Sequence, residues 1–383
     1  MDKPITVLFD AGPMVNGQKS GVGYYTYRLI DALARNFPDD IKLVGHYFNF
    51  LGRKHPQLPT HPNIRYKSSR LLPGKVLSIL RRVGLQLPFD LLVKSKGDIV
   101  LFPNYVCLPV LQPAKKVIAI HDLCFEDFPE YLQKPNRNFL KRFVPPSVKK
   151  ADLVITISES TKKSIQKHYA TDSKKFLITP IPPEATAKEK TPPPKNLVLP
   201  KKYLLFISTL EPRKNYLGLA RAYALLPGSL KKDYGLVLAG GMGWETEEPM
   251  AEIKQLQESG ENIVVTGYVD ESTRLFLYQN ASLLVVPSHY EGFGMPILEA
   301  MSYAVPVAVS DIPVFHEVAG GAALYFNKDD PASIASAIKD VITNESLQAQ
   351  LIEKSVAQLK NFSWDDVADE VMRSFRGILD SKK

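Results

Sequence analysis

The sequence predicts an α/β protein built from two domains, each with a doubly wound parallel sheet. Short apolar runs alternate with helical patterns along the chain, and this alternation is typical of βαβ units. Most of the runs are almost continuously apolar, as expected for parallel strands that are buried on both faces. A length of 383 residues fits two domains of roughly 100–200 residues each.

The predicted strands form two sets, separated by a proline-rich stretch. The first set is Ile5–Phe9, Lys42–Tyr47, Ile99–Phe102, Val117–Ile120, Leu153–Ile157 and Phe176–Thr179. The second set is Tyr203–Ile207, Leu236–Ala239, Ile263–Thr266, Leu283–Val286, Val305–Val309 and Ala323–Phe326. Residues 180–200 hold seven prolines among polar residues, and proline does not fit central strands or helix interiors. We expect an N-terminal domain over 1–180, a semi-extended linker over 181–200 and a C-terminal domain over 201–362.

A separate helix is predicted over 363–383. Ser363 and Asp366 have the spacing of a capping box. From Val367 onward, apolar residues recur every four positions and form one stripe of a helix.

The composition excludes several classes of protein. With 45% hydrophobic and 23% charged residues, the chain is too apolar to be disordered. Its two cysteines, Cys107 and Cys124, are too few for a disulfide framework or a four-cysteine zinc site. We expect free thiols in a reducing cytoplasm. The N-terminus lacks the pattern of a signal peptide, and no apolar stretch reaches the about 18 residues of a membrane span.

The charge is distributed unevenly between the two halves. The whole chain carries +8, but residues 1–200 carry +15 and residues 201–383 carry −7. Residues 51–100 alone contribute +8. This asymmetry indicates that the two domains meet different partners.

A loop with glycines and two carboxylates follows the predicted strand Leu283–Val286. It reads SHYEGFGMPILE over residues 288–299, and ligands of doubly wound sheets bind beyond the carboxyl ends of strands. Glu291 and Glu299 could accept hydrogen bonds from hydroxyls on both sides of a diphosphate. A tight turn with two solvated glutamates explains the pattern about equally well. The backbone N–H groups that would meet an anion at the helix N-terminus are those of Phe293, Gly294 and Met295.

Two basic residues follow the first strand of the same domain. The segment STLEPRKN over 208–215 contains Arg213 and Lys214. Arginine offers a planar fork to phosphate oxygens and lysine a mobile point charge. A solvated basic loop is the alternative interpretation. No Asp-x-Asp pair is present to hold a metal-bound diphosphate, so these cations and helix N-termini would have to neutralise it.

The N-terminal domain offers two weaker signals. A glycine-rich loop after the first strand leads into a helix at Gly21 and Gly23, but it matches neither a dinucleotide fingerprint nor a P-loop. His121 follows the strand Val117–Ile120, where a histidine would face a ligand site. A plain loop and a structural histidine remain the alternatives.

Taken together, the motifs resemble retaining glycosyltransferases of family 4, which have the GT-B fold. The resemblance covers nearly the whole chain. It is strongest over SHYEGFGMPILEAMSYAVPVAVSDIP, with further matches at EPRKN, IHDL, TISES and GVGYYT. The family's fold has two Rossmann-like domains facing a cleft and a final helix that returns to the N-terminal domain. Within the family, the chain resembles bacterial mannosyltransferase-like members that build cell-surface polysaccharides.

The resemblance implies a role for each candidate residue. Arg213 and Lys214 would neutralise the diphosphate of a nucleotide-sugar donor, and Glu299 would bind its ribose. Glu291 would contact the donor sugar, and His121 would approach that sugar near its 6-position. The remaining donor-binding residues would be Gly21, Gly23, Phe293, Gly294 and Met295, with residues 267–269 near the base. Tyr24 stands where many relatives have an arginine, which weakens the case for phosphate contact by the first loop.

The resemblance also implies a retaining reaction without a cofactor or metal. The expected donor is GDP-mannose, with UDP-sugars second. The expected acceptor is a glycan or a lipid-diphosphate-linked glycan. Two other classes stay open: another GT-B enzyme such as a nucleotide-sugar epimerase, and a basic nucleic-acid-binding protein. The latter is disfavoured because no nucleic-acid-binding module is evident.

The basic segment within 51–100 suggests contact with an anionic membrane surface. Large apolar residues are mixed there with Lys75, Arg81 and Arg82, as in helices that lie on a bilayer. A core helix with a solvated basic rim fits equally well. We therefore expect a cytoplasmic protein. Peripheral contact with the inner face of the membrane is one of two interpretations of its basic segment, and a core helix is the other.

Overall fold

A computed structural model describes residues 3–15, 20–49, 52, 56–70, 87–184, 189–195 and 197–381. The chain divides into two compact units. The N-terminal unit comprises Met1–Ile181 and Ser363–Lys383, and the C-terminal unit comprises Pro182–Phe362. Each unit is described by itself below.

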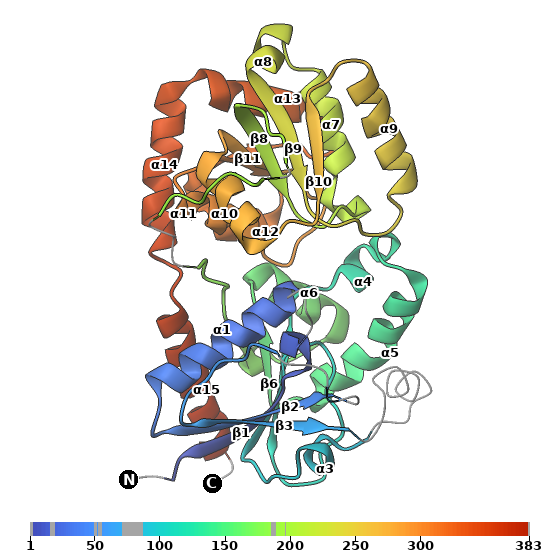
Figure 1. The fold of residues 1–383 in the computed structure, drawn as a ribbon. Coiled ribbons are helices and arrows are strands. Elements are labelled where there is room, and N and C mark those ends of the chain that lie inside the picture. Colours follow the sequence, from blue (N-terminus) through green and yellow to red (C-terminus); the bar gives the residue numbers. More distant parts are fainter. Residues whose placement is uncertain are drawn as a thin grey trace. The chain divides into compact units, whose positions relative to one another are not determined.

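The N-terminal unit contains one parallel sheet in the order β3-β2-β1-β4-β5-β6-β7 (Figure 1). Its strands are β1 (Ile5–Asp10), β2 (Ile41–Phe48), β3 (Ile64–Ser69), β4 (Ile99–Phe102), β5 (Lys115–Ile120), β6 (Leu153–Thr156) and β7 (Phe176–Ile178). Its helices are α1 (Gly21–Asn36), α3 (Phe89–Val93), α4 (Cys124–Asp127), α5 (Lys134–Lys150), α6 (Glu159–Tyr169) and α15 (Trp364–Asp380). Strands β2 and β3 are added on one side of β1, and β4 to β7 are added on the other side. The boundary between β1 and β4 is therefore the switch point, where ligands of such sheets bind.

The six strands predicted for this unit are confirmed, and one strand was missed. Strand β3 reads IRYKSS, with charged residues at Arg65 and Lys67. It pairs only with β2. An edge strand has a neighbouring strand on one side only, and some of its side chains face water. It therefore lacks the continuous apolar run by which buried parallel strands are recognised.

Helix α15 completes the N-terminal unit from the far end of the sequence. Its N-cap is Ser363, whose hydroxyl accepts from the backbone of Asp365 and Asp366, as predicted. Val367, Val371 and Phe375 are buried, and the helix packs along α1 (Figure 1). The predicted return of the final helix to the N-terminal domain is confirmed.

The C-terminal unit contains a second parallel sheet, in the order β10-β9-β8-β11-β12-β13. Its strands are β8 (Lys202–Ile207), β9 (Tyr234–Ala239), β10 (Ile263–Gly267), β11 (Leu283–Val286), β12 (Val307–Ser310) and β13 (Ala323–Phe326). Its helices are α7 (Tyr216–Ala224), α8 (Gly228–Asp233), α9 (Glu247–Glu258), α10 (Glu271–Asn280), α11 (Met295–Ser302), α12 (Pro313–Ala319), α13 (Pro331–Thr343) and α14 (Glu345–Leu359). All six predicted strands of this unit are present.

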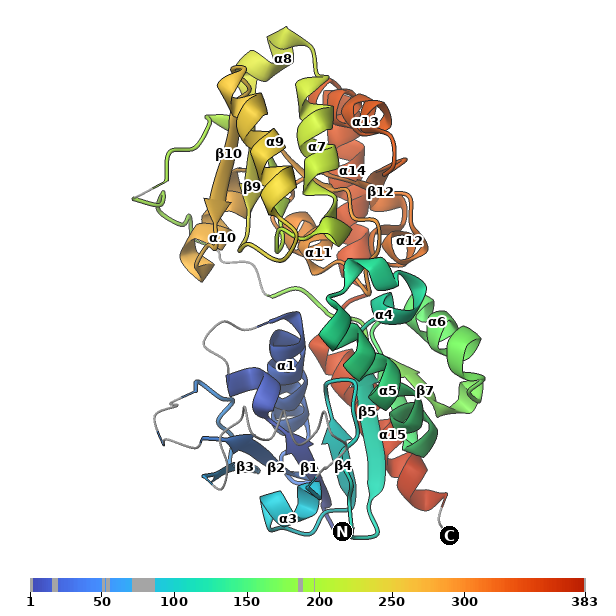
Figure 2. The same ribbon diagram turned by 90° about the vertical axis from the view of Figure 1, so that its right-hand side faces the viewer.

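Two helical layers enclose this second sheet. Helix α7 packs against both α9 and α13 on one face, and α10, α11 and α12 cover the other (Figure 2). The core between α7, α13 and the strands contains Phe206, Tyr216, Tyr223 and Ile338, all buried. The switch point of this sheet lies between β8 and β11, the two strands that the candidate loops follow.

The predicted linker has contacts of its own within the C-terminal unit. The backbone N–H of Thr191 donates to Oε1 of Gln279, and Nε2 of Gln279 donates to the carbonyl of Glu189. Gln279 lies on α10, so this stretch is fastened to that helix. The division between the two units falls after Ile181.

Candidate active site

The loops after β8 and β11 meet at the switch point of the C-terminal sheet. After β8, Pro212–Lys214 form a single 3₁₀ turn, and α7 begins after Asn215, whose φ is 53°. The backbone N–H of His289, in the loop after β11, donates to the carbonyl of Arg213 at 2.9 Å. The two loops are therefore joined directly through their backbones.

Glu291 binds both predicted cations. The carboxylate accepts from Nη1 of Arg213 at 2.9 Å and from Nζ of Lys214 at 2.5 Å. The hydroxyl of Ser288 donates to the same carboxylate at 2.9 Å. Arg213 also pairs with Glu211 at 2.7 Å. These two cations and two carboxylates form a compact, charge-balanced cluster.

The cluster is largely withdrawn from water. The Lys214 and Glu291 side chains are 12% and 10% exposed. Burial by itself raises the pKa of Glu291, but the charges of Lys214 and Arg213 outweigh it and lower that pKa to about 2. Burial, together with the adjacent Arg213 charge, lowers the pKa of Lys214. Glu291 is thus ionised at neutral pH, and two cations compete for its charge.

The turn into α11 depends on a glycine. Gly294 has a φ of 107°, and a Cβ atom there would lie 2.8 Å from the Phe315 ring. Met295 is the first residue of the helix and Pro296 the second. Phe293, the residue before Gly294, is buried. The first N–H groups of a helix have no acceptor within the helix, as an anion site requires.

Glu299 lies on α11, one turn beyond this N-terminus. Its Oε1 accepts from Nη1 of Arg274 at 2.6 Å. Arg274 also faces the Glu184 carboxylate, with Nη2 3.7 Å from Oε2. Glu299 is therefore held by an arginine from α10.

The loops after β9 and β10 border the same edge of the sheet. A Cβ atom at Gly240, where φ is 147°, would lie 1.8 Å from the carbonyl oxygen of Ser208, so this close approach requires glycine. Met242 and Tyr268 are more than half exposed. Residues 267–269, predicted to lie near a base, thus place an exposed aromatic ring beyond the end of β10.

His121 belongs to the N-terminal unit, where it follows β5. Its Nε2 lies 2.8 Å from the carbonyl oxygen of Pro103. Because a carbonyl can only accept, Nε2 carries the proton, and Nδ1 of the neutral ring is an acceptor. The ring is buried, contacts the Tyr25 ring edge-to-face, and has a lowered pKa because of that burial. His121 is neutral at pH 7.

Gly21 and Gly23 form the first turn of α1. The N–H of Gly23 donates to the Ser20 hydroxyl, the N-cap of this helix, at 3.3 Å. A Cβ atom at Gly23 would lie 2.5 Å from the Pro13 carbonyl oxygen. This glycine is therefore required for packing, and its N–H already has an acceptor. Gly17, also part of the predicted loop, lies outside the described residues.

The predicted site residues thus fall into two groups. One group gathers at the switch point of the C-terminal unit and on α11: Arg213, Lys214, Glu291, Phe293, Gly294, Met295 and Glu299. The other group, His121, Gly21 and Gly23, lies in the N-terminal unit. Among the described residues, no group of three or more His, Cys, Asp or Glu side chains could hold a metal ion.

Three residues of the site were not predicted: Glu211, Ser288 and Arg274. Glu211 is buried two positions before Arg213, and an acidic residue inside a basic loop was a usable signal. Ser288 lies three positions before its partner Glu291 in the same loop, so this short spacing was a usable signal as well. Arg274 carries no local signal, because Glu299 becomes its neighbour only through the fold.

Comparison with known proteins identifies the relatives of this chain. The family model described as glycosyl transferases group 1 matches residues 187–358, and the model for glycosyltransferase family 4 matches residues 19–182. O-antigen chain mannosyltransferase B of Escherichia coli is 30% identical over 93% of this chain and 96% of its own length. O-antigen chain mannosyltransferase RfbU of Salmonella typhimurium is 30% identical over 84% of this chain and 88% of its own.

A solved structure has the same fold. Sucrose-phosphate synthase from Thermosynechococcus elongatus superposes with a TM-score of 0.74 at 16% identity, covering 98% of this chain and 100% of that one. The predicted GT-B fold is confirmed, and the protein is a glycosyltransferase. It belongs to glycosyltransferase family 4.

Proposed function

We propose that this protein transfers mannose, with retention of anomeric configuration, from GDP-mannose to a glycan or lipid-diphosphate-linked glycan during synthesis of a cell-surface polysaccharide. Two relatives that align over most of their length are named as O-antigen chain mannosyltransferases. Both support the sugar and the process. The observation that carries the donor site is the buried cluster of Arg213 and Lys214 around Glu291.

The cluster suits a diphosphate because its cations are held in place before a ligand arrives. Arg213 is fixed by Glu211 and by the carbonyl of Tyr290, and Lys214 by Glu291. A diphosphate that enters the loop brings additional negative charge to a site that is balanced without it. The Glu291 carboxylate would then share the cations with phosphate oxygens and turn one oxygen toward the sugar hydroxyls.

The proposed reaction takes place on one face of the sugar. The bond between the anomeric carbon and the diphosphate oxygen breaks, and the acceptor hydroxyl oxygen bonds to that carbon from the same side. The acceptor proton passes to the departing phosphate oxygen. Arg213, Lys214 and the N-terminus of α11 would stabilise the charge that grows on the leaving group, and such preorganised stabilisation is usually the largest catalytic effect.

The remaining residues bind and orient the substrates in this proposal. Glu299 accepts from ribose hydroxyls, and neutral His121 contacts the sugar near its 6-position from the N-terminal unit. The proposal needs no cofactor and no metal, since Arg213 and Lys214 would neutralise the diphosphate charge that a metal ion could otherwise neutralise. Gly23 is a packing residue here, because its N–H is already bonded to Ser20.

A donor panel tests the function. Purified protein is incubated with GDP-mannose, GDP-glucose, UDP-glucose or ADP-glucose, with and without a lipid-linked glycan acceptor, and release of nucleotide is measured. We expect release that depends on the acceptor and is fastest with GDP-mannose, and NMR of the product should show an α-linkage. Release of nucleotide without an acceptor would point to hydrolysis or epimerisation. Faster release from a UDP-sugar would replace GDP-mannose by that UDP-sugar as the donor.

We also propose that the N-terminal unit contacts an anionic membrane surface. Of the basic residues that suggest this, Arg53, Lys54, Lys75, Arg81 and Arg82 lie outside the described residues. Within the described part, Leu91 on α3 is 57% exposed and Leu111 is 67% exposed. The backbone of Leu111 donates to the Asp90 carboxylate, so these leucines lie in one patch. No described helix is long and apolar enough to span a membrane.

Sedimentation with lipid vesicles tests this surface. We expect binding to vesicles with 30% anionic phospholipid, little binding to neutral vesicles, and weaker binding by the double variant Leu91→Ser/Leu111→Ser. Leu225→Ser is the matched control, since Leu225 is 60% exposed but belongs to the C-terminal unit. Equal, negligible sedimentation with both lipid compositions would remove the membrane proposal.

A further inference from the structure

Arg274 touches a carboxylate of the donor site without being part of the predicted site. It lies on α10, and its Nη1 donates to Oε1 of Glu299 on α11 at 2.6 Å. Its side chain is 25% exposed and that of Glu299 is 17% exposed. This is a partly buried, charge-assisted contact, which is stronger than a surface ion pair.

The guanidinium is held from its other side as well. Nη2 of Arg274 lies 3.7 Å from the Glu184 carboxylate, at the start of the predicted linker. Gln279, further along α10, binds the backbone of the same stretch at residues 189 and 191. The described parts of the linker therefore contact α10 at two places, and the Arg274 guanidinium lies between the Glu184 and Glu299 carboxylates.

Glu299 has little freedom in this environment. Tyr278, one turn beyond Arg274 on α10, is buried, and burial together with the Glu299 charge raises its pKa well above the ordinary value. The carboxylate is thus bounded by the Tyr278 side chain and by the arginine. Arg274 occupies one oxygen through a single nitrogen. A carboxylate has about four acceptor positions, so positions besides those that face Arg274 and Tyr278 remain to accept from a ligand.

We propose that Arg274 is a positioning residue, which orients the Glu299 carboxylate to accept both ribose hydroxyls of the nucleotide donor. The inference rests on the proposed function, in which Glu299 binds the ribose of the donor. A pair of vicinal hydroxyls needs a carboxylate in one fixed plane. An unsupported glutamate would lose its rotational freedom on binding, whereas Arg274, together with Tyr278, already restricts that freedom.

The test compares binding of GDP with that of 2′-deoxy-GDP by calorimetry, with UDP and 2′-deoxy-UDP as a second pair. In the unaltered protein we expect the ribonucleotide to bind about 10- to 100-fold more tightly, as a hydrogen bond to a charged group allows. Arg274→Gln should reduce that ratio about 3- to 10-fold. Arg274→Lys, which keeps a charged donor, should restore part of it.

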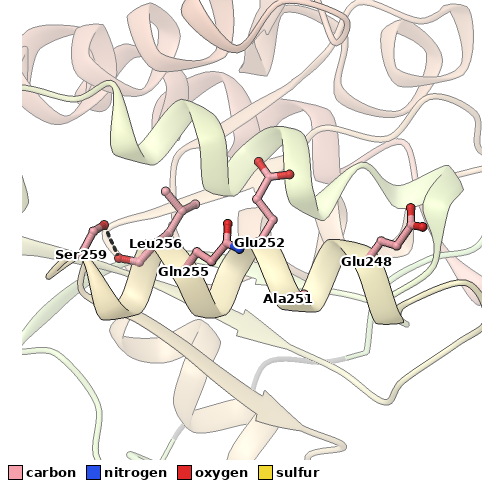
Figure 3. Close-up of a pocket in the computed structure, with 6 residues that line it drawn as sticks. All are labelled: Glu248, Ala251, Glu252, Gln255, Leu256 and Ser259. Carbon is pink, nitrogen blue, oxygen red and sulfur yellow. Dashed lines mark hydrogen bonds between the residues drawn. The ribbon is translucent and has the colours of Figure 1, made fainter.

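The ratio of two dissociation constants separates positioning from general damage. A partly unfolded variant lowers the measured stoichiometry, and a loosened site weakens both nucleotides equally; neither changes the ratio. The matched control is Arg221→Ala. Arg221 on α7 makes a two-point contact with Glu252 at 2.6 and 2.7 Å, and Glu252 lies on α9 beside a shallow surface groove (Figure 3). This control should leave the ratio unchanged.

Each negative result has a distinct meaning. If the unaltered protein binds none of these nucleotides, the proposed function fails and the inference fails with it. If it prefers the ribonucleotide and Arg274→Gln keeps the full preference, only the inference is overturned. A protein that binds GDP and 2′-deoxy-GDP equally would also overturn the inference, while leaving the glycosyl transfer intact.

Discussion

Replacing Glu291 by glutamine should destabilise the C-terminal unit by an amount that depends on pH. The pKa of Glu291 falls from its ordinary value of 4.5 to about 2 in the folded protein. At about 1.4 kcal/mol for each tenfold change in the ionisation constant, this difference is worth about 3 kcal/mol of folding free energy. The value is an upper limit, because the lowered pKa of Lys214 shows that burial of the cation offsets part of the gain.

The sign of the pH dependence follows from the lowered pKa. The stabilisation by Glu291 is fully present above about pH 4.5, where the carboxylate is ionised in both states. It is lost as the pH falls toward 2, because the unfolded chain then binds the proton first. The difference in unfolding free energy between the unaltered protein and Glu291→Gln should therefore be at most about 3 kcal/mol at pH 7 and shrink steadily below pH 4.5.

Tryptophan fluorescence during urea unfolding can measure this difference. The chain has two tryptophans, Trp244 in the C-terminal unit and Trp364 on α15. In a Trp364→Phe background the signal comes from the C-terminal unit alone. Glu252→Gln is the control, since its exposed pair with Arg221 should be worth less than about 1 kcal/mol.

Two results would refute this reasoning. Glu291→Gln could unfold at the same urea concentration as the background protein at pH 7, which would mean that the ion pairs add no net stability. Alternatively, the variant could be destabilised equally at pH 7 and pH 3. The loss would then come from packing, and the ionised carboxylate would have no part in it.

Three further predictions concern catalysis and the α11 turn. Lys214→Ala should lower kcat by about 100- to 1000-fold, a loss typical of one electrostatic group at a developing negative charge, and intact turnover would exclude the leaving-group role. Glu291→Gln should keep measurable turnover with retained configuration, as assayed by NMR of the product, because the proposed reaction needs no carboxylate nucleophile; loss of all turnover in a folded, donor-binding variant would instead favour double displacement. Gly294→Ala should destabilise the C-terminal unit by more than about 1 kcal/mol and raise KM for the donor, because alanine is strained at a φ of 107° and its Cβ would meet Phe315 at 2.8 Å; a Tm and KM equal to those of the unaltered protein would show that the turn tolerates a side chain.

The sequence predicts the fold well where strands are buried on both faces. Twelve of the thirteen strands in the described chain were predicted from their apolar runs. The exception, β3, is exposed along one edge, and charged residues interrupt its pattern. The linker is a different case: its prolines indicate an extended chain, but they carry no information about its contacts with Gln279 and Arg274.

The candidate site was predicted in its members but not in its electrostatics. Arg213 and Lys214 were expected as cations available to a diphosphate, yet both bind Glu291, which lies 77 or more positions along the chain. Local patterns identify which residues follow a strand. They cannot tell which of those residues neutralise one another, since that depends on the order of strands in the sheet.

The return of α15 to the N-terminal unit has a consequence for biosynthesis. As the polypeptide leaves the ribosome, residues 182–362 emerge as one uninterrupted segment that holds the whole C-terminal unit. Residues 1–181 emerge earlier, but the α1 surface that packs against α15 stays uncovered until α15 has been made. Because the N-terminal unit needs a segment that is synthesised after the whole C-terminal unit, the unit that begins first is the last to receive all of its parts.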